Sequence, residues 1–441
     1  MTILNCFFHL ILIFQLYSSL LLILFSYIQV KSLALESHFE TVGTTPVQCK
    51  RYFNFTDPKV WPKSTFEVFN MYGPCSPTAG KNPKNMPSVH EILHHDRLRV
   101  ESLQARFKHN SKIKKNDTRF KDTKEVTHIP VLRSGSYLIS VSFGTHQQIK
   151  TLTFVTGIIM QYFVATHTCD RTTYEDAGSY FKGVFSRDIL NITQTGEVFP
   201  KFLFGCVTET NNLDVDGLLG LSKTQVSFVS QTSDIYKGIF SYCIPSGPSE
   251  IGFMKLGPRD YPNDDVKFTR FITSSNYDPS FYFIDITSIK VAGVELSIGK
   301  FDLIFPGTII DSGTTYTYLP KNVYTAMRDE FRKKIRSKNR IIVKSPSKKL
   351  DTCYGNSVYN IVPTITLFIF EGGVSVDMNG SVTLISVLDN QQPRRSFACL
   401  AFAENIKDDD VSIFGNYQQR RFEVVYDVYG KGLGFIPNKC P

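Results

Sequence analysis

From residue 134 to its end, the chain consists of short runs rich in Val, Ile, Phe, Tyr and Thr, separated by Gly, Pro and Asn. Runs of this length with these boundaries predict β-strands, and no βαβ alternation is present. We therefore expect an all-β body with few short helices. Strands are predicted at residues 136–143, 201–206, 282–291, 308–310, 365–370, 396–402 and 421–426, and one helix at 323–335.

Two segments of this body are similar to each other. Residues 154–157 (Phe-Val-Thr-Gly) and 310–314 (Ile-Asp-Ser-Gly-Thr) both read as a strand that enters a turn. Each is followed by two apolar residues and a glycine, at 218–220 and 413–415 respectively. A duplicated β-lobe would give this arrangement.

The N-terminus indicates the compartment. Residues 1–30 contain no Asp, Glu, Lys or Arg, and Ser32-Leu33-Ala34 supplies a small-x-small cleavage site. Residues 1–34 are therefore predicted to be a secretory signal peptide, with a signal anchor as the alternative because the apolar run could span a bilayer. We expect a secreted, extracellular or endomembrane protein, with no membrane contact after signal cleavage.

The net charge of +9 is unevenly distributed. Residues 35–130 hold 16 Lys+Arg and 10 Asp+Glu, whereas residues 131–441 hold 32 and 30. The body is thus almost neutral, and its net charge gives no support for nucleic-acid binding. Residues 35–130 are predicted to be a basic pro-segment with an exposed linker, which covers a cleft or assists folding.

The pro-segment contains a predicted helix. Ser88 and Glu91 form a capping box, in which Ser88 is the N-cap. An apolar stripe at helical spacing follows, and its members are Val89, Leu93, Val100, Leu103 and Phe107.

The same helix start contains the pattern His-Glu-x-x-His at His90, Glu91 and His94. In zinc peptidases two histidines at this spacing bind the metal and the glutamate is the general base. Here capping already explains Glu91, and no further histidine follows at the spacing that extended zinc motifs require. We therefore expect no metal and no cofactor.

Eight cysteines remain after the signal sequence, and an even number in an exported chain predicts disulfide bonds. Four Asn-x-Ser/Thr sequons are candidate glycosylation sites in that compartment. They begin at Asn54, Asn116, Asn191 and Asn379.

Residues 307–314 resemble the second active-site segment of pepsin-type aspartic peptidases. Segments 240–245, 350–354, 399–403, 413–419 and 424–427 resemble the plant nepenthesin-like branch, and 72–76 with 91–93 resemble its chloroplast-nucleoid-protease-like members. The resemblance implies a bilobal pepsin-like double β-barrel with a central cleft, with lobes at 131–245 and 246–441. It also implies a monomer, a polypeptide substrate or peptide-like ligand, and the disulfides Cys353–Cys399 and Cys243–Cys440. The pairing of Cys49, Cys75, Cys169 and Cys206 stays open.

In that family two aspartates share one proton, because two carboxylates so close together cannot both ionise. One accepts a proton from the attacking water while the other donates one to the substrate carbonyl. The resemblance assigns Asp311 to the second position and Val155 to the first. The residues of the two turns are otherwise present, namely Thr156 and Gly157 in the first and Ser312, Gly313 and Thr314 in the second.

Tyr174 resembles the flap tyrosine of the family, but only 18 residues lie between it and Val155, so the N-terminal lobe is expected to be shortened. We expect an aspartic-type endopeptidase by family that is catalytically impaired, since valine can neither accept nor donate a proton. One alternative is a non-catalytic protein that binds a peptide, an inhibitor or a glycan. Another is a chain whose N-terminal lobe does not fold.

Overall fold

The computed structural model describes residues within one compact unit, Cys49–Pro441. The described ranges are 49–51, 64–79, 86–116, 137–143, 148–158, 162–164, 181–192, 195–210, 215–258, 266–273, 277–338, 342–343, 350–355, 358–359, 362, 366–370, 374–388, 396–430, 432–437 and 439–440. No helix within these ranges combines the length and the apolar character needed to span a membrane. The predicted signal peptide, residues 1–34, lies outside them.

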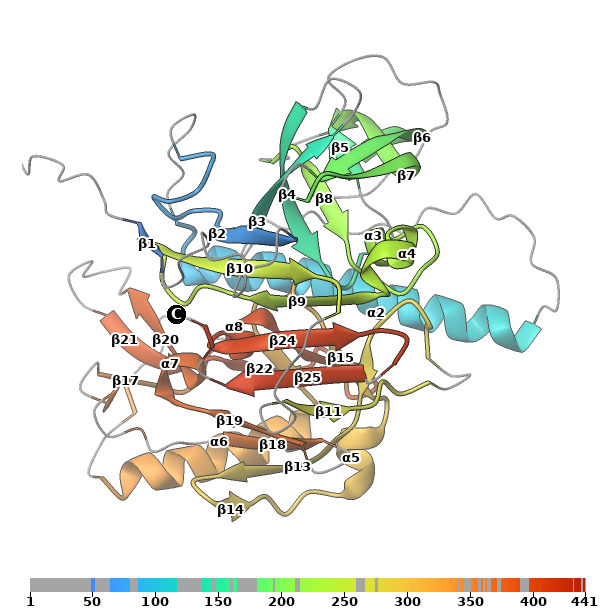
Figure 1. Ribbon diagram of the computed structural model, residues 1–441. Coiled ribbons are helices and arrows are strands. Elements are labelled where there is room, and N and C mark those ends of the chain that lie inside the picture. The colour runs from blue at the N-terminus through green and yellow to red at the C-terminus, as the bar shows by residue number, and fades with distance from the viewer. Residues whose placement is uncertain are drawn as a thin grey trace, which may run out of the picture. The chain divides into compact units, whose positions relative to one another are not determined.

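One sheet contains 13 of the described strands and joins segments from the whole chain (Figure 1). In spatial order they are β11 (Lys267–Thr269), β25 (Gly432–Pro437), β24 (Phe422–Asp427), β9 (Ile239–Cys243), β10 (Glu250–Leu256), β2 (Thr65–Asn70), β3 (Tyr137–Phe143), β4 (Gln148–Val155), β8 (Gly217–Gly220), β5 (Tyr162–Val164), β7 (Glu197–Thr210) and β6 (Phe181–Ile192), with β1 (Lys50–Arg51) beside β10.

Three smaller sheets lie in the C-terminal part of the chain. The first is β12 (Phe283–Ile284), β15 (Thr308–Ile310), β23 (Ser412–Phe414), β16 (Thr317–Leu319) and β22 (Phe402–Glu404). The second is β14 (Val294–Glu295), β13 (Ile286–Val291), β18 (Thr366–Phe370) and β19 (Val374–Met378), and the third is β17 (Cys353–Gly355), β21 (Ser396–Leu400) and β20 (Leu384–Leu388).

Two helices in the described ranges are long, α2 (Val89–Asn116) and α6 (Lys321–Arg336). The short ones are α3 (Phe228–Gln231), α4 (Ser233–Tyr236), α5 (Lys300–Ile304), α7 (Gly380–Thr383) and α8 (Asn416–Gln419). The prediction of a mainly β protein with few helices is confirmed. The double barrel, its central cleft and the lobe boundaries at 131–245 and 246–441 stay predictions.

Two predicted strands are each divided in the structure. Residues 282–291 form β12 and β13, which belong to different sheets, and residues 396–402 form β21 and β22. The backbone of Ala401, between β21 and β22, donates to the carbonyl of Thr383. A continuous apolar run cannot show where a chain leaves one sheet for another, since side chains are buried in both.

The predicted pro-segment supplies a strand inside the large sheet. β2 lies between β10 and β3, where Val68 is opposite Gly252 and Phe69 is opposite Leu138. Phe66 and Val68 are buried in the main hydrophobic cluster. A disulfide between Cys49 and Cys75 joins the chain before β2 to the chain after it. Residues predicted as an accessory segment therefore form part of the core.

The two similar segments pair in the same way. β4 runs parallel to β8, with Val155 opposite Gly220, and β15 runs parallel to β23, with Ile310 opposite Phe414. Each parallel pair ends at one of the two turns, so it fixes the place of the residues that follow.

Replacing Val68 by Ala should lower the free energy of unfolding by about 2 kcal/mol, because the lost methyl groups leave a cavity in a buried strand. Urea unfolding of the full chain measures this. Glu67→Gln on the same strand is the control and should change stability by less than about 0.5 kcal/mol. Equal effects of the two substitutions would show that β2 is not packed as described.

Candidate functional site

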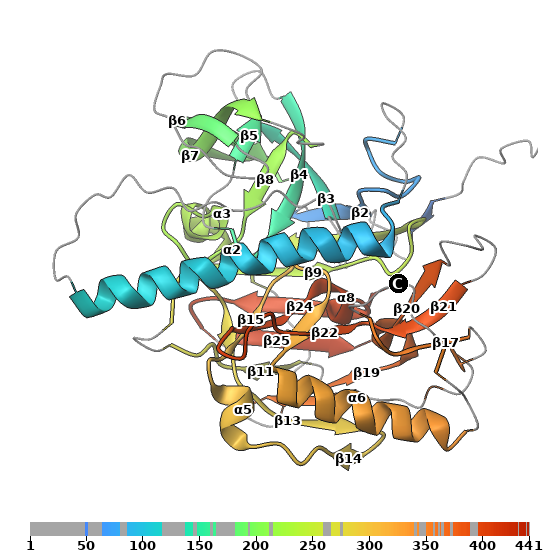
Figure 2. The same cartoon turned by 180° about the vertical axis from the view of Figure 1, so that it is seen from behind.

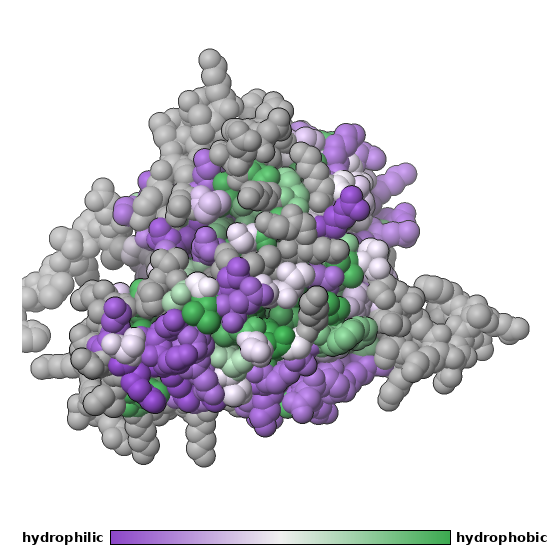
Figure 3. Space-filling model, turned by 90° about the horizontal axis from the view of Figure 1, so that it is seen from below, coloured by the Kyte–Doolittle hydropathy of each residue, from purple (hydrophilic) through white to green (hydrophobic). Residues whose placement is uncertain are grey.

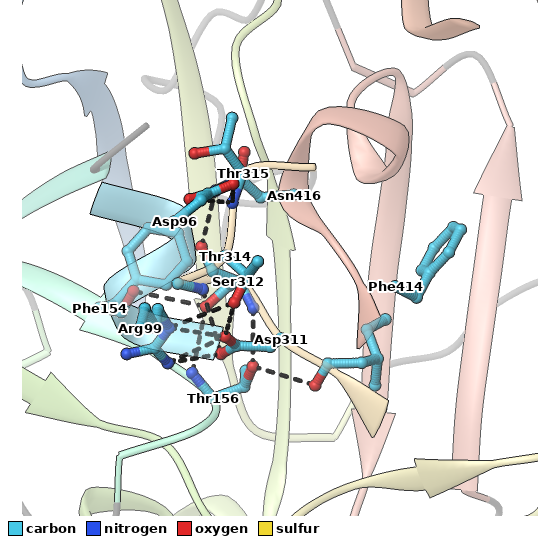
Figure 4. A network of polar contacts seen from close by, with 12 residues as sticks. Asp96, Arg99, Phe154, Thr156, Asp311, Ser312, Thr314, Thr315, Phe414 and Asn416 are labelled. Carbon is cyan, nitrogen blue, oxygen red and sulfur yellow. Dashed lines mark hydrogen bonds and ion pairs between the residues drawn. The ribbon is translucent and has the colours of Figure 1, made fainter. Parts of the chain in front are cut away.

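The turns after β4 and β15 hold each other through reciprocal hydrogen bonds (Figure 4). The backbone N–H of Thr156 donates to Ser312 Oγ over 3.1 Å, and that of Ser312 donates to Thr156 Oγ1 over 2.9 Å. Thr156 Oγ1 also donates to the carbonyl of Ile310, and Ser312 Oγ to that of Phe154, both over 3.4 Å. Both hydroxyl residues are buried, so the two turns form one braced unit.

Val155 and Asp311 occupy equivalent places on this unit. A Cβ atom added to Gly157 would lie 2.7 Å from Asp311 Oδ1, and one added to Gly313 would lie 2.6 Å from Val155 Cγ1. The side chain from each turn thus packs on the glycine of the other turn. Both side chains are fully buried. The centre therefore contains one carboxylate, and an isopropyl group stands where the symmetry of the site would place the second.

Arg99 of α2 neutralises that carboxylate. Its Nε donates to Asp311 Oδ2 over 2.9 Å and its Nη2 to Oδ1 over 3.0 Å. Thr314 Oγ1 donates to Oδ2 over 2.6 Å, and the backbone N–H of Gly313 to Oδ1 over 3.1 Å. Arg99 is only 1% exposed. Two parallel bonds from one guanidinium make this a strong and directional pair.

The pKa of Asp311 reflects these partners. Burial alone would raise it, but the charge of Arg99 and the hydrogen bonds from Arg99, Thr314 and Gly313 hold the pKa below its ordinary value. Asp311 is therefore ionised while α2 is in place, and its oxygens are already occupied by donors.

Asp96, one turn before Arg99, fixes the helix to the same turn of the chain. Its carboxylate accepts the backbone N–H of Thr315 at 2.9 and 3.0 Å and that of Tyr316 at 2.9 Å. Burial raises the pKa of Asp96 to about 7, against the lowering effect of these hydrogen bonds and of Arg99. Asp96 is 1% exposed, so both charged residues lie on the buried face of α2.

The next turns of α2 contact other segments of the body. Gln104 exchanges two hydrogen bonds with the backbone of Val411, at 2.8 and 2.9 Å. Arg106 Nη2 donates to Ser280 Oγ over 2.7 Å, and Arg106 Nε lies 3.3 Å from Asp278 Oδ2. Figure 2 shows α2 in full length across this side of the molecule.

The apolar stripe of α2 is also buried as predicted. Leu93, Val100 and Leu103 are buried and pack in a cluster with residues of the C-terminal part, and Val89 and Phe107 are partly buried against it. This helix therefore covers Asp311 through both apolar and polar contacts.

The remaining predicted residues are distributed as follows. Asn191 is half-buried on β6 and Asn379 is exposed, where its Oδ1 accepts the backbone N–H of Ser381 and caps α7. Asn116 is the last residue of α2. Tyr174 and Asn54 lie outside the described residues.

The structure contains disulfides between Cys243 and Cys440 and between Cys353 and Cys399, the two pairs that the resemblance implies. Cys49 is bonded to Cys75, a pairing that the sequence left open. Cys206 is also disulfide-bonded.

The His-Glu-x-x-His pattern lies on the exposed start of α2. Both His90 and His94 are exposed, and Glu91 accepts hydrogen bonds from the backbone N–H and the hydroxyl of Ser88 at 2.7 and 2.8 Å. The predicted capping box is confirmed. Within the described part of the chain, no group of three or more His, Cys, Asp or Glu side chains could hold a metal ion.

Sequence reasoning missed Asp96 and Arg99. A signal was present, because Asp96 follows Leu93 by three residues and precedes Val100 by four, which puts it on the apolar stripe. A charged residue on a buried helical face requires a partner. The sequence could not identify the partners of the two residues. Asp96 accepts from the backbone of Thr315 and Tyr316, and Arg99 pairs with Asp311, which lies 212 residues further along the chain.

Comparison with known proteins matches residues 161–258 and 281–437 to the families described as "Xylanase inhibitor N-terminal" and "Xylanase inhibitor C-terminal". An aspartyl protease family protein of Arabidopsis thaliana is 32% identical over 436 residues, which cover 86% of this chain and 88% of that protein. Aspartic proteinase nepenthesin-2 of Nepenthes gracilis is 32% identical over 286 residues, 62% of this chain and 61% of that protein.

A solved structure, titled as the crystal structure of edgp, is similar in fold. The TM-score is 0.57 at 16% sequence identity, and the likeness covers 69% of this chain and 92% of that one. Because the identity is low, this likeness is evidence on the fold alone.

Replacing Arg99 by Met should lower the free energy of unfolding by about 3–5 kcal/mol at pH 7, because it leaves a buried charge on Asp311 without a partner. Chemical unfolding measures the effect. Arg99→Met combined with Asp311→Asn should recover much of the loss, because no buried charge then remains. Additive losses in the double variant would contradict the pairing.

The two carboxyls of the interface should give opposite pH dependences. Asp311, with a lowered pKa, loses its stabilising effect as pH falls below the ordinary value of 3.8. Asp96, with a pKa raised to about 7, destabilises the folded form progressively between pH 3.8 and about 7. From the pH dependence of these two groups, we expect the contact of α2 with the body to be most stable near pH 4.

Asp96→Asn should therefore remove the decline between pH 4 and 7, which amounts to on the order of 2–4 kcal/mol. Amide hydrogen exchange of α2 as a function of pH is the measurement. Asp302→Asn, at the first turn of α5, serves as control and should keep the wild-type profile. The same decline in Asp96→Asn as in the wild type would contradict the assignment.

Proposed function

Since the chain belongs to the plant family of pepsin-like aspartic proteases, we propose that it is a member that binds a polypeptide segment at the active-site position without hydrolysing it. One observation carries the proposal: the braced turns present a single carboxylate, Asp311, opposite the side chain of Val155.

Hydrolysis by this family needs two functions at once. One carboxylate removes a proton from water while a second, protonated carboxyl donates to the amide carbonyl. Asp311 can perform one of these functions. The side chain of Val155 has no ionisable group, and loss of one member of a concerted set costs several orders of magnitude in rate.

The framework that supports binding is kept. Thr156 and Ser312 still brace the two turns, and the backbone N–H groups of Thr315 and Tyr316 donate to the carboxylate of Asp96 on α2. In the structure the bound segment is α2 of the same chain. The disulfides suggest an extracellular or secretory environment, where an external segment could replace it.

Three classes of ligand are compatible with a non-catalytic role, namely a peptide, an inhibitor and a glycan, and the first is the one proposed above. The matched families are named for xylanase inhibitors, which supports a non-catalytic role by analogy. The described strands β3, β4, β6, β7 and β8 contribute to the main hydrophobic cluster, which speaks against an unfolded N-terminal half.

A second candidate function is residual endopeptidase activity after α2 leaves. The retention of Asp311 together with both glycines and both hydroxyl residues of the turns favours it. One assay distinguishes the two functions.

We expect the purified chain, and its Arg99→Met variant with a weakened α2 contact, to show no pepstatin-sensitive cleavage of casein between pH 3 and 6. Restoring the acid with Val155→Asp in the Arg99→Met background should produce cleavage, by at least about a thousandfold over Arg99→Met alone, because the proton donor and acceptor are then both present.

Asp311→Asn added to that double variant is the matched control and should abolish the cleavage. Pepstatin-sensitive cleavage by the wild type that is lost on Asp311→Asn would overturn the proposal in favour of the endopeptidase.

A further inference from the structure

The near neutrality of residues 131–441 hides a strong separation of charge. Residues 321–349 hold 11 Lys+Arg and 2 Asp+Glu, a net charge of +9. The rest of residues 131–441 holds 21 and 28, a net charge of −7. A net charge near zero therefore does not describe the local field at this segment.

The first part of this segment is α6, which is strongly amphipathic. Val323, Tyr324, Met327, Phe331 and Ile335 are buried against the body. The other face and the residues that follow the helix carry the cations, which are Lys321, Arg328, Arg332, Lys333, Lys334, Arg336 and Lys338. We call these seven residues the α6 basic face.

The basic face contains a shallow recess at the end of the helix. Its volume is about 470 Å³, and it is lined by Asp329, Arg332, Lys333, Arg336 and Ser337. In the view from below in Figure 3, toward the side on which α6 lies in Figure 1, hydrophilic side chains gather over this region. The recess has room for part of an extended polar ligand, and every residue that lines it is polar or charged.

Acidic side chains among the described residues neutralise part of the positive charge. Arg328 and Arg332 lie 2.9 and 3.2 Å from the carboxylate of Asp351. Lys333 and Lys334 share Glu330, at 3.2 and 3.5 Å.

The side chains of Arg336 and Lys338 are exposed and make no hydrogen bond or ion pair with the part of the chain that the structure describes. The face thus keeps an excess of positive charge at its C-terminal end.

The helix dipole explains part of this excess, because Lys333, Lys334 and Arg336 lie in the last turn of α6, where cations interact favourably with it. Lys338 lies beyond the end of the helix. Arg332 and Arg336, four residues apart, are like charges on neighbouring positions, and such a pair destabilises a helix. An anion bound in the recess between them would relieve this repulsion.

We propose that the α6 basic face binds an acidic polysaccharide, through carboxylate groups spaced along an extended chain. The positive charge and the polar lining of the recess favour a polyanion. A helix that inserts into a lipid surface buries apolar side chains there, and no apolar residue lines the recess. The disulfides indicate an extracellular or secretory environment, in which acidic polysaccharides are accessible and nucleic acids are scarce. This face contributes no residue to the centre at Asp311.

The test uses the full chain and polygalacturonate immobilised on beads, with uncharged dextran beads as the reference polymer. We expect binding to polygalacturonate alone, weakening steeply as salt rises. The variant Lys333→Gln/Arg336→Gln/Lys338→Gln should bind about tenfold more weakly at low salt, since three cations near the polyanion are removed. An unchanged thermal unfolding midpoint shows that this variant is folded.

The matched control removes three exposed lysines elsewhere, as Lys201→Gln/Lys407→Gln/Lys439→Gln, and should bind within about twofold of the wild type. Equal weakening in both variants would show that net charge alone drives binding and would overturn the proposal. So would an absence of binding by the wild type, or tighter binding to anionic vesicles or to single-stranded DNA than to polygalacturonate.

Discussion

The buried ion pair between Arg99 and Asp311 connects the two features on which the site depends. It fixes α2 over the braced turns, and it determines the protonation state of the one carboxylate they contain. A fully buried arginine requires one compensating negative charge. The centre supplies one, Asp311, because Val155 occupies the other position. Among the residues that the structure describes, the Nη1 atom of Arg99 is buried and has no hydrogen-bond partner. With Val155 in place of a second acid, the single positive charge of Arg99 is balanced by the single negative charge of Asp311.

Much of the fold could be predicted from local patterns. The apolar runs located β3, β15, β18 and β24 to within about one residue, and the helical period located α6. Local patterns could not show where β12 gives way to β13, because Phe283 and Ile289 are equally buried in two different sheets. They also did not show that β2 enters the large sheet, since its partners β10 and β3 are brought to it by the tertiary fold.

For the site, resemblance to a family identified Asp311 and the residues of the two turns, and it identified Val155 as the departure. It did not identify Arg99, because pairing over 212 residues cannot be read from either residue's neighbours. The net charge of residues 131–441 was misleading for a different reason. It sums a positive segment, formed by α6 and the residues that follow it, with a remainder of negative net charge.

The position of β2 has a consequence for the integrity of the molecule. A single cut between Asn116 and Tyr137 would leave β2 bonded between β10 and β3, and α2 bonded to the turns and to Val411. None of the disulfides between described residues, Cys49–Cys75, Cys243–Cys440 and Cys353–Cys399, joins the two pieces. They would then form a heterodimer in which the smaller chain completes the sheet of the larger. Its stability would depend on protein concentration, as for any obligate complex. Dilution, rather than the cut itself, would separate the helix from Asp311.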